Sequence, residues 1–108
     1  MTKRAHPEQD TKDAIRLAAH SLGCVLYLNT IDHRNKRLGL GEGTSDLIGF
    51  LVPEGTFLAV EVKSARGRER PAQELFRELV TRSGGLAIVA RSVDDVADAL
   101  RMWRATKR

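Results

Sequence analysis

The sequence predicts an α/β layer fold in which helices flank a small mixed sheet, with the element order α-β-β-β-α-β-α. Short apolar runs rich in Val, Leu, Ile and Phe alternate with longer segments whose apolar residues recur at helical spacing. Two of the apolar runs are joined by Pro53-Glu54-Gly55, a turn signal typical of a hairpin. A helical segment separates the third and fourth runs and is expected to act as the crossover between them.

Length and composition predict a single globular domain over residues 1–108. Hydrophobic residues make up 42% and charged residues 30% of the chain, a balance that argues against disorder. No apolar run approaches the ~20 residues needed to cross a bilayer, so we expect no membrane partner. The single cysteine, Cys24, lies in an apolar run and is expected to be a small buried residue in a protein of the reducing cytoplasm.

The first elements are a helix and a strand. Residues 1–7 form a basic arm that we expect to be frayed. Apolar residues at helical spacing predict a helix over residues 8–22, and Gly23 suits its end. The apolar run 24–29 predicts the first strand, and the glycine-containing, basic segment 30–43 predicts a mobile loop.

The hairpin and the elements after it complete the fold. Its strands are expected over residues 46–52 and 56–62, and a loop over 64–70 leads to a helix that begins at Pro71. Its buried stripe is predicted to contain Leu75, Phe76, Leu79 and Val80. Gly84-Gly85 closes this helix, a strand follows over 86–90, and Ser92 with Asp95 predicts the capped start of a last helix. Residues 104–108 are expected to form a flexible basic tail.

Charged residues interrupt the apolar hairpin at its two ends. Asp46 stands at the entrance of the first strand, and Glu61 and Lys63 stand at the exit of the second. Because side chains alternate between the faces of a strand, Glu61 and Lys63 are expected on one face. A carboxylate in an apolar strand is unfavourable unless it is paired or binds a cation. The acidic pair therefore predicts a site for Mg²⁺ or Mn²⁺, which one or two carboxylates typically hold.

Three further positions fit chemistry at such an ion. Lys63 is expected to orient the attacking water or to stabilise charge in the transition state. Glu8, at the start of the first helix, would add a third carboxylate if that helix packs over the hairpin, and Asp10 and Asp13 are rivals for this role. Gln73, in the first turn of the second helix, is expected to hydrogen-bond a phosphate or a water at the ion.

Basic residues gather in the two loops that flank this acidic centre. They are Arg34, Lys36 and Arg37 in the first loop, and Arg66, Arg68 and Arg70 in the second. Together with a net charge of +4, two such clusters predict contacts with a phosphate backbone. Aromatic residues are few and mostly lie in apolar runs, so stacking on bases is not the expected binding mode.

Several motifs follow one another in a definite order: Gly43-Thr44-Ser45-Asp46, the hairpin, Glu61-Val62-Lys63, and Pro71-Ala72-Gln73. Glu8 precedes the first helix, Asn29 ends the first strand, and the run 84–90 is followed by Ser92. This combination resembles the VRR-NUC branch of the PD-(D/E)XK nucleases over nearly the whole chain, the basic ends excepted. The chain departs from that pattern at Arg70, where a capping Ser or Thr is common.

The resemblance implies a PD-(D/E)XK, or restriction-endonuclease-like, core and an active site formed by Glu8, Asp46, Glu61, Lys63 and Gln73. Asp46 and Glu61 would hold the ion together with the main-chain carbonyl of Val62, and Glu8 is a further candidate ligand. The implied activity is that of a Mg²⁺- or Mn²⁺-dependent DNA endonuclease. Members of similar size form homodimers and prefer branched or structured DNA, such as four-way junctions.

Two other functions stay open on the sequence alone. One is a DNA-binding module that keeps the nuclease fold without turnover, although the presence of all the charged positions counts against it. The other is an interaction subunit that dimerises through its last helix, in which Trp103 lies either in the core or on the dimer face.

Overall fold

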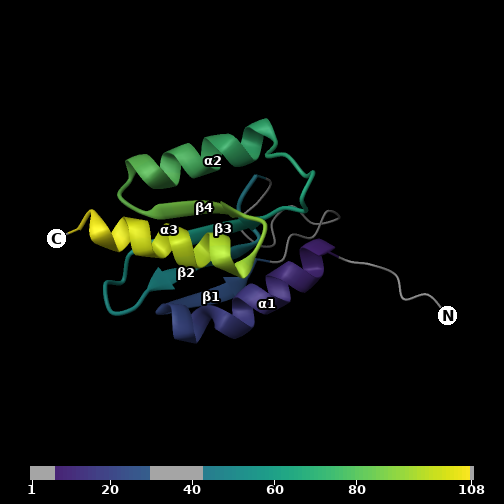
Figure 1. Ribbon diagram of the computed structural model, residues 1–108. Helices are drawn as coiled ribbons and strands as arrows, with labels where there is room; N and C mark the ends of the chain where they lie inside the picture. The colour runs from purple at the N-terminus through teal and green to yellow at the C-terminus, as the bar shows by residue number, and fades with distance from the viewer. Residues whose placement is uncertain (1–6, 30–42, 108) are drawn as a thin grey trace.

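The computed structural model describes residues 7–29 and 43–107 of the chain. Its helices and strands follow in the predicted order: α1 (Pro7–Leu22), β1 (Cys24–Leu28), β2 (Leu47–Leu51), β3 (Phe57–Val62), α2 (Pro71–Arg82), β4 (Leu86–Ala90) and α3 (Val93–Ala105) (Figure 1). The predicted fold class is confirmed. Four of the eight strand ends differ from the prediction by one residue, and in each case the paired strand is shorter than the predicted run.

The four strands form one mixed sheet in the order β1-β2-β3-β4. β2 pairs antiparallel with both β1 and β3, and β4 lies parallel to β3, so α2 is the predicted crossover. Pairing of β2 with β3 ends where Leu47 lies opposite Val60, whereas β3 continues beside β4 until Val62 lies opposite Ala90. The last residues of β3 therefore extend past the end of β2, and Asp46 lies at this step in the sheet.

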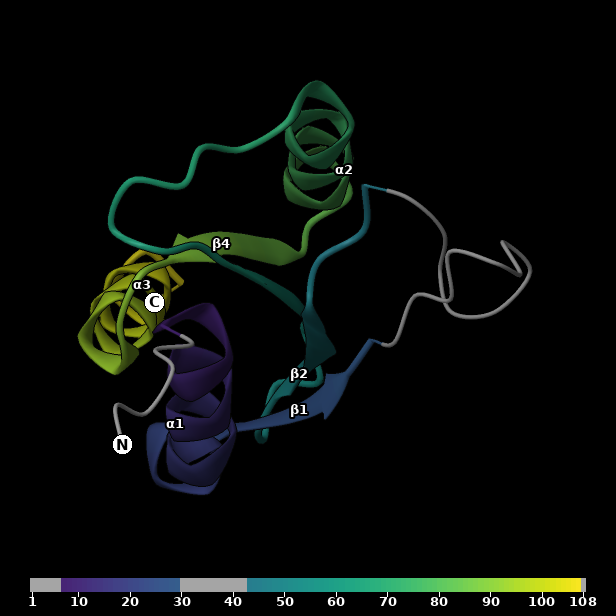
Figure 2. The same cartoon turned by 90° about the vertical axis from the view of Figure 1, so that its right-hand side faces the viewer.

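Helices cover the two faces of the sheet unequally. α1 and α3 lie on one face, and α2 lies on the other, above β3 and β4 (Figure 2). The core lies between the sheet and the α1–α3 layer, and its fully buried side chains include Ile15, Leu47, Leu58, Val96 and Leu100. Cys24 is buried in this core, and burial raises the pKa of its thiol, as expected of an inert cysteine. No helix within the described ranges is long and apolar enough to cross a membrane.

The face of the sheet that α2 covers only in part exposes three aromatic side chains. Tyr27, Phe50 and Phe57 are 62%, 39% and 41% exposed, and Phe50 lies directly opposite Phe57 in the register. These apolar runs do form strands, as predicted. The composition of a run shows that it is a strand, but not whether both of its faces will be covered.

The predicted buried stripe of α2 is wrong for Leu75 and Leu79, which are 65% and 59% exposed. Val80 is buried as predicted, and Gln73 is buried with it. The helix turns the face that carries Gln73, Phe76 and Val80 toward the sheet, because Gln73 hydrogen-bonds a residue of β3. The two leucines lie away from that face.

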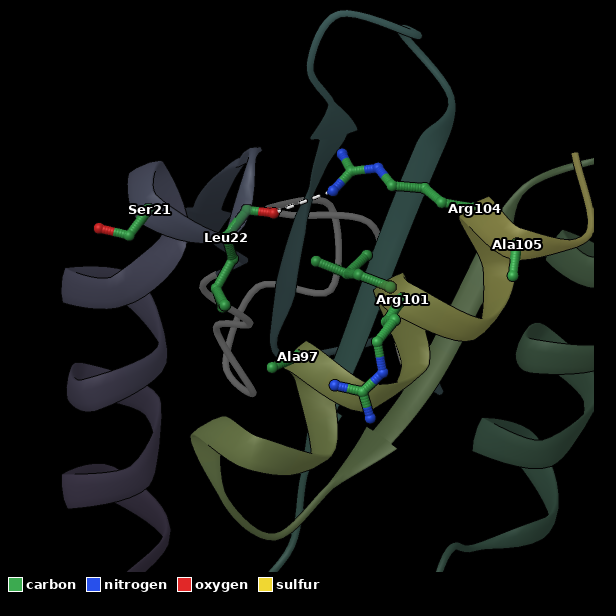
Figure 3. A pocket seen from close by; sticks show the side chains of 7 residues that line it. Ser21, Leu22, Ala97, Arg101, Arg104 and Ala105 are labelled. Carbon is green, nitrogen blue, oxygen red and sulfur yellow. Dashed lines mark hydrogen bonds between the residues drawn. The ribbon is translucent and has the colours of Figure 1, made fainter. Parts of the chain in front are cut away.

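The last helix continues through Arg104, where the sequence predicted the start of a flexible tail. The Arg104 guanidinium donates to the carbonyl oxygens of Leu22 and Gly23 at 3.1 and 2.9 Å, and to Glu54 Oε2 at 2.9 Å. It crosses the pocket between the ends of α1 and α3, as Figure 3 shows. Arg104 therefore ties the C-terminus of α1 and the β2–β3 turn to α3. Trp103 is partly buried and packs against the core.

Candidate active site

A cleft of about 460 Å³ opens where α1, the segment before β2, the end of β3 and the start of α2 meet. The five predicted site residues all line it: Glu8, Asp46, Glu61, Lys63 and Gln73. The step between β2 and β3 makes room for this cleft, because no strand of the sheet pairs with the β2 side of the last residues of β3. Residues from four separate segments thus face one space.

Asp46 is held at the mouth of β2 by the backbone on both sides of it. The backbone N–H of Asn29 donates to the carbonyl oxygen of Asp46 at 2.8 Å, and the Asn29 side chain donates to the carbonyl oxygen of Ser45 at 3.0 Å. Asp46 Oδ2 accepts a hydrogen bond from the N–H of Val62 at 2.8 Å. Because the N–H and C=O of one strand residue point to the same side, the carbonyl of Val62 faces the same side as Asp46.

Glu61 is buried, with only 5% of its surface exposed. Its Oε1 accepts a hydrogen bond from Gln73 Nε2 at 2.9 Å and lies 3.6 Å from the Nζ of Lys63, so Glu61 and Lys63 share a face as predicted. Its Oε2 is buried and has no hydrogen-bond partner within the described part of the chain. Burial, and then the neighbouring carboxylate of Asp46, raise the pKa of Glu61 to about 7.

This donor set fits a hard divalent cation. Glu61 Oε2 is a buried oxygen that the described residues leave without a partner. Asp46 is close enough to raise the pKa of Glu61, and the Val62 carbonyl faces the same side as Asp46. Two carboxylates, a carbonyl and water are a common shell for Mg²⁺ or Mn²⁺. A cation there would remove the repulsion between the carboxylates and give the unpartnered oxygen a ligand.

Glu8 lies beside this pair. Its Oε1 accepts a hydrogen bond from the N–H of Ser64 at 3.2 Å, which joins the first turn of α1 to the end of β3. Among residues 7–29 and 43–107, no group of three acidic, His or Cys side chains is already arranged to hold a metal ion, and Glu8 as a third ligand stays a prediction. Its rivals, Asp10 and Asp13, are exposed on α1 and do not line the cleft.

Gln73 has both ends of its side-chain amide engaged. Its Oε1 accepts a hydrogen bond from the N–H of Arg70 at 2.8 Å, and its Nε2 donates to Glu61. The first bond supports the start of α2, where Arg70 stands in place of the usual capping residue. These contacts favour a role in orienting Glu61 over the direct phosphate contact that the sequence suggested.

Lys12 is a site residue that the sequence reasoning missed. Its Nζ lies 3.4 Å from Asp46 Oδ1, and its side chain is 19% exposed. Lys12 follows Glu8 by one helical turn, a spacing that puts the two side chains on the same face of α1. That spacing was the available signal, but it becomes informative only once Glu8 is known to face the cleft.

The loop between β3 and α2 carries the second basic cluster. Arg70 lines the cleft, while Arg66 and Arg68 are exposed on the same loop outside its lining. The first cluster, Arg34, Lys36 and Arg37, lies outside the described residues.

Two contacts hold this basic loop in place. The Arg91 side chain donates to the carbonyl oxygen of Gly67 at 2.8 Å. The Arg77 guanidinium makes paired hydrogen bonds to Glu69, through Nε at 2.9 Å to Oε2 and through an NH2 group at 2.9 Å to Oε1. These bonds raise the pKa of Arg77. The loop is therefore anchored to α2 and to the start of the β4–α3 connection, with its exposed arginines pointing to solvent.

Comparison with known proteins agrees with this architecture. The family model of the VRR-NUC domain matches residues 8–94. A solved structure described as a VRR_NUC domain superposes with a TM-score of 0.67 at 21% identity, and covers 90% of this chain and 97% of that one. A second, described as a VRR_NUC domain protein, has a TM-score of 0.66 at 18% identity over 94% and 90% of the two chains. Among curated proteins, none matches the sequence.

Proposed function

The chain belongs to the VRR-NUC domain family, whose members are generally nucleases, and we propose that it is a Mg²⁺- or Mn²⁺-dependent DNA endonuclease. The observation that carries the proposal is the acidic pair in the cleft: Asp46 is the neighbour of Glu61, which is buried and has one oxygen without a partner in the part of the chain that the structure describes. A buried carboxyl whose pKa is raised to about 7 by a second carboxylate, with Lys63 beside it, is typical of a functional site.

Asp46, Glu61 and the main-chain carbonyl of Val62 would hold the ion. When bound there, Mg²⁺ or Mn²⁺ would neutralise negative charge on the phosphodiester and favour ionisation of a water molecule. The chain's own contribution is to fix these oxygens in advance. The N–H of Val62 orients Asp46, and the amide of Gln73 orients Glu61, so neither carboxylate has to be ordered when the ion arrives.

Lys63 places a positively charged ammonium group in the cleft at the end of a flexible side chain. Its Nζ lies 3.6 Å from Glu61 Oε1, and the side chain lines the cleft. From this position its ammonium group would donate to the attacking water or to a phosphate oxygen that gains charge in the transition state. Glu8 secures the end of β3 through Ser64, next to Lys63, and so acts as a positioning residue.

DNA is the substrate of this proposal. Arg70 at the cleft and the anchored, exposed Arg66 and Arg68 offer a cationic path for a phosphate backbone. We assign branched DNA, such as a four-way junction, as the preferred substrate, a homodimer as the active form and the cytoplasm as the location. The sequence resemblance supports the first two. A chain of 108 residues offers one cleft, and a symmetric pair would present one to each of two strands.

The test is cleavage of a labelled four-way junction and a linear duplex of the same sequence, with Mg²⁺, Mn²⁺ or EDTA. The parent should cut the junction faster and only with an ion. Lys63→Met should abolish cleavage with little loss of DNA affinity, whereas Lys107→Met, a change of the same type just after the end of α3, should cut like the parent. Cleavage by Lys63→Met at the parent rate would overturn the catalytic assignment.

Two further results would change the proposal. Binding of the junction without cleavage in either ion would point to the DNA-binding module instead. A solution mass equal to one chain at the working concentration would remove the homodimer.

A further inference from the structure

Lys12 reaches the acidic pair from a rigid helix. Its Nζ lies 3.4 Å from Asp46 Oδ1. One turn earlier, Glu8 fixes the start of α1 to the end of β3 through the N–H of Ser64. Further along, Ile15 and Ala19 are buried in the core, so the helix is held at both ends of this stretch. The backbone at Lys12 is therefore held in place, and its flexible side chain is the part that can change its partner.

Asp46 divides its two oxygens between two partners. Oδ2 accepts the hydrogen bond from Val62 N–H, and Oδ1 faces the ammonium of Lys12. A divalent ion shared by Asp46 and Glu61 would claim an oxygen of Asp46 and would repel a lysine already placed there. The ion and Lys12 therefore compete for the same carboxylate.

The same reasoning does not apply to Lys63. Its partner is Glu61 Oε1, whereas Glu61 Oε2 is the oxygen with no hydrogen-bond partner among residues 7–29 and 43–107. An ion can bind Glu61 at Oε2 while Oε1 keeps Gln73 and Lys63. The two lysines thus differ in what ion binding requires of them, and Lys12 is the one that must move.

A displaced Lys12 has a new partner when DNA is bound. Its side chain is a long flexible stem with a charged end, it is 19% exposed, and it lies beside Asp46, which lines the cleft. Asp46 no longer offers it an anion, because the ion occupies that carboxylate. A phosphate entering the cleft to reach the ion is the anion that can replace Asp46, and lysine binds phosphate as a point charge.

We propose that Lys12 is an exchangeable counter-ion, paired with Asp46 in the ion-free protein and transferred to a DNA phosphate when a divalent ion takes its place. The second half of this inference rests on the proposed function. The exchange keeps the acidic pair partly neutralised before the ion arrives, and it couples ion binding to binding of the DNA backbone.

The first measurement is Mn²⁺ binding to the DNA-free protein by calorimetry. Lys12→Met removes the charge and keeps the apolar stem, and it should bind Mn²⁺ roughly twofold to fivefold more tightly, as expected for loss of one partly exposed ion pair. Arg16→Met removes a charge from an exposed position one turn further along α1 and should leave Mn²⁺ affinity unchanged. Circular dichroism should show that both variants are folded. Unchanged or weaker Mn²⁺ binding by Lys12→Met would overturn the exchange.

The second measurement is the salt dependence of four-way junction binding. In Ca²⁺, Lys12→Met should lower the slope of log K against log salt by about 0.9 relative to the parent, the loss of one phosphate contact. In EDTA, where Lys12 stays on Asp46, the two slopes should agree. Equal slopes of the parent and Lys12→Met in Ca²⁺ would overturn the proposed transfer of Lys12 to a DNA phosphate. Both readouts are binding measurements, so a parent that cleaves no DNA while both hold would refute the proposed function alone.

Discussion

Gln73 and Glu61 are joined by a buried hydrogen bond of 2.9 Å, which connects the first turn of α2 to the C-terminal end of β3. The same glutamine accepts a hydrogen bond from the N–H of Arg70, so one side chain supports both the helix start and the carboxylate. This explains why a polar residue is buried to 6% exposure on α2 while two leucines of that helix are exposed. The contact between Gln73 and Glu61 in the cleft, together with the packing of the core, therefore determines which face of α2 lies against the sheet.

Replacing Gln73 should therefore affect stability as well as activity. Gln73→Ala leaves the N–H of Arg70 without its acceptor and the Oε1 of Glu61 with Lys63 alone, and we expect the free energy of unfolding to fall by about 1–3 kcal/mol. Glu74→Ala, at the next and exposed position, is the control and should change it by less than about 0.5 kcal/mol. Urea unfolding at fixed pH measures both. Equal effects of the two changes would show that the glutamine amide contributes nothing to the fold.

Glu61 should make the stability of the ion-free protein depend on pH. Because its pKa is raised in the folded protein, from 4.5 to about 7, the folded state is favoured while the carboxyl is protonated. That stabilisation is complete below pH 4.5 and is lost as the pH rises through about 7, up to about 3 kcal/mol in all. In EDTA, Glu61→Gln should remove this loss between pH 5 and 8.

Two controls accompany the pH measurement. Glu78→Gln, which changes an exposed carboxylate of α2, should keep the pH dependence of the parent. Mn²⁺ at pH 8 should raise the unfolding temperature of the parent much more than that of Glu61→Gln, because the bound ion stabilises the ionised carboxylate. If the stability of the parent in EDTA does not change between pH 5 and 8, ionisation of Glu61 does not destabilise the folded protein and the predicted rise in its pKa is wrong.

Gly43 lies where the cleft meets the start of α2. Its φ is +84°, and a Cβ there would lie 2.8 Å from both the Cβ and the carbonyl oxygen of Ala72. Gly55, in the β2–β3 turn, has a similar φ of +75° but nothing within 4 Å of its Cβ position. Gly55→Ala should lower the free energy of unfolding by about 1–2 kcal/mol through backbone strain alone.

Gly43→Ala should cost more than Gly55→Ala, because the clash with Ala72 adds to the same strain. It should also slow cleavage, because α2 carries Gln73 and must shift to relieve the clash. Thermal unfolding and cleavage rates of the two variants, compared side by side, give the result. Equal stability of the two variants would argue against close packing of Gly43 on α2.

Arg104 should stabilise the protein despite its place near the C-terminus. Its guanidinium donates to the carbonyl oxygens of Leu22 and Gly23 and to the carboxylate of Glu54, and this hydrogen bonding lowers the pKa of Glu54. We expect Arg104→Met to lower the free energy of unfolding by about 1–3 kcal/mol, because the Leu22 carbonyl loses the guanidinium donor and the Gly23 carbonyl keeps only the N–H of Val52. Arg101→Met removes an exposed arginine from the same helix and should change it by less than about 0.5 kcal/mol. An Arg104→Met protein as stable as Arg101→Met would refute the tether.

Local patterns in the sequence predicted what depends on neighbouring residues. Strand runs, helical spacing and the capping signal at Ser92 identified every element, because the periodicity of a segment reflects its own backbone geometry. The alternation of strand side chains also placed Glu61 and Lys63 on one face. The motif order assigned Asp46 and Gln73 to the same site, and both residues line the cleft.

Only the tertiary structure decided which faces are covered and which distant charges meet. Periodicity gave the apolar positions of α2 but not the contact of Gln73 with Glu61 on β3, so Leu75 and Leu79 were wrongly expected to be buried. The contact of Lys12 with Asp46 and the tether from Arg104 to Leu22 join segments far apart in the chain. Such contacts depend on how whole elements are packed against each other, which no short stretch of sequence encodes by itself.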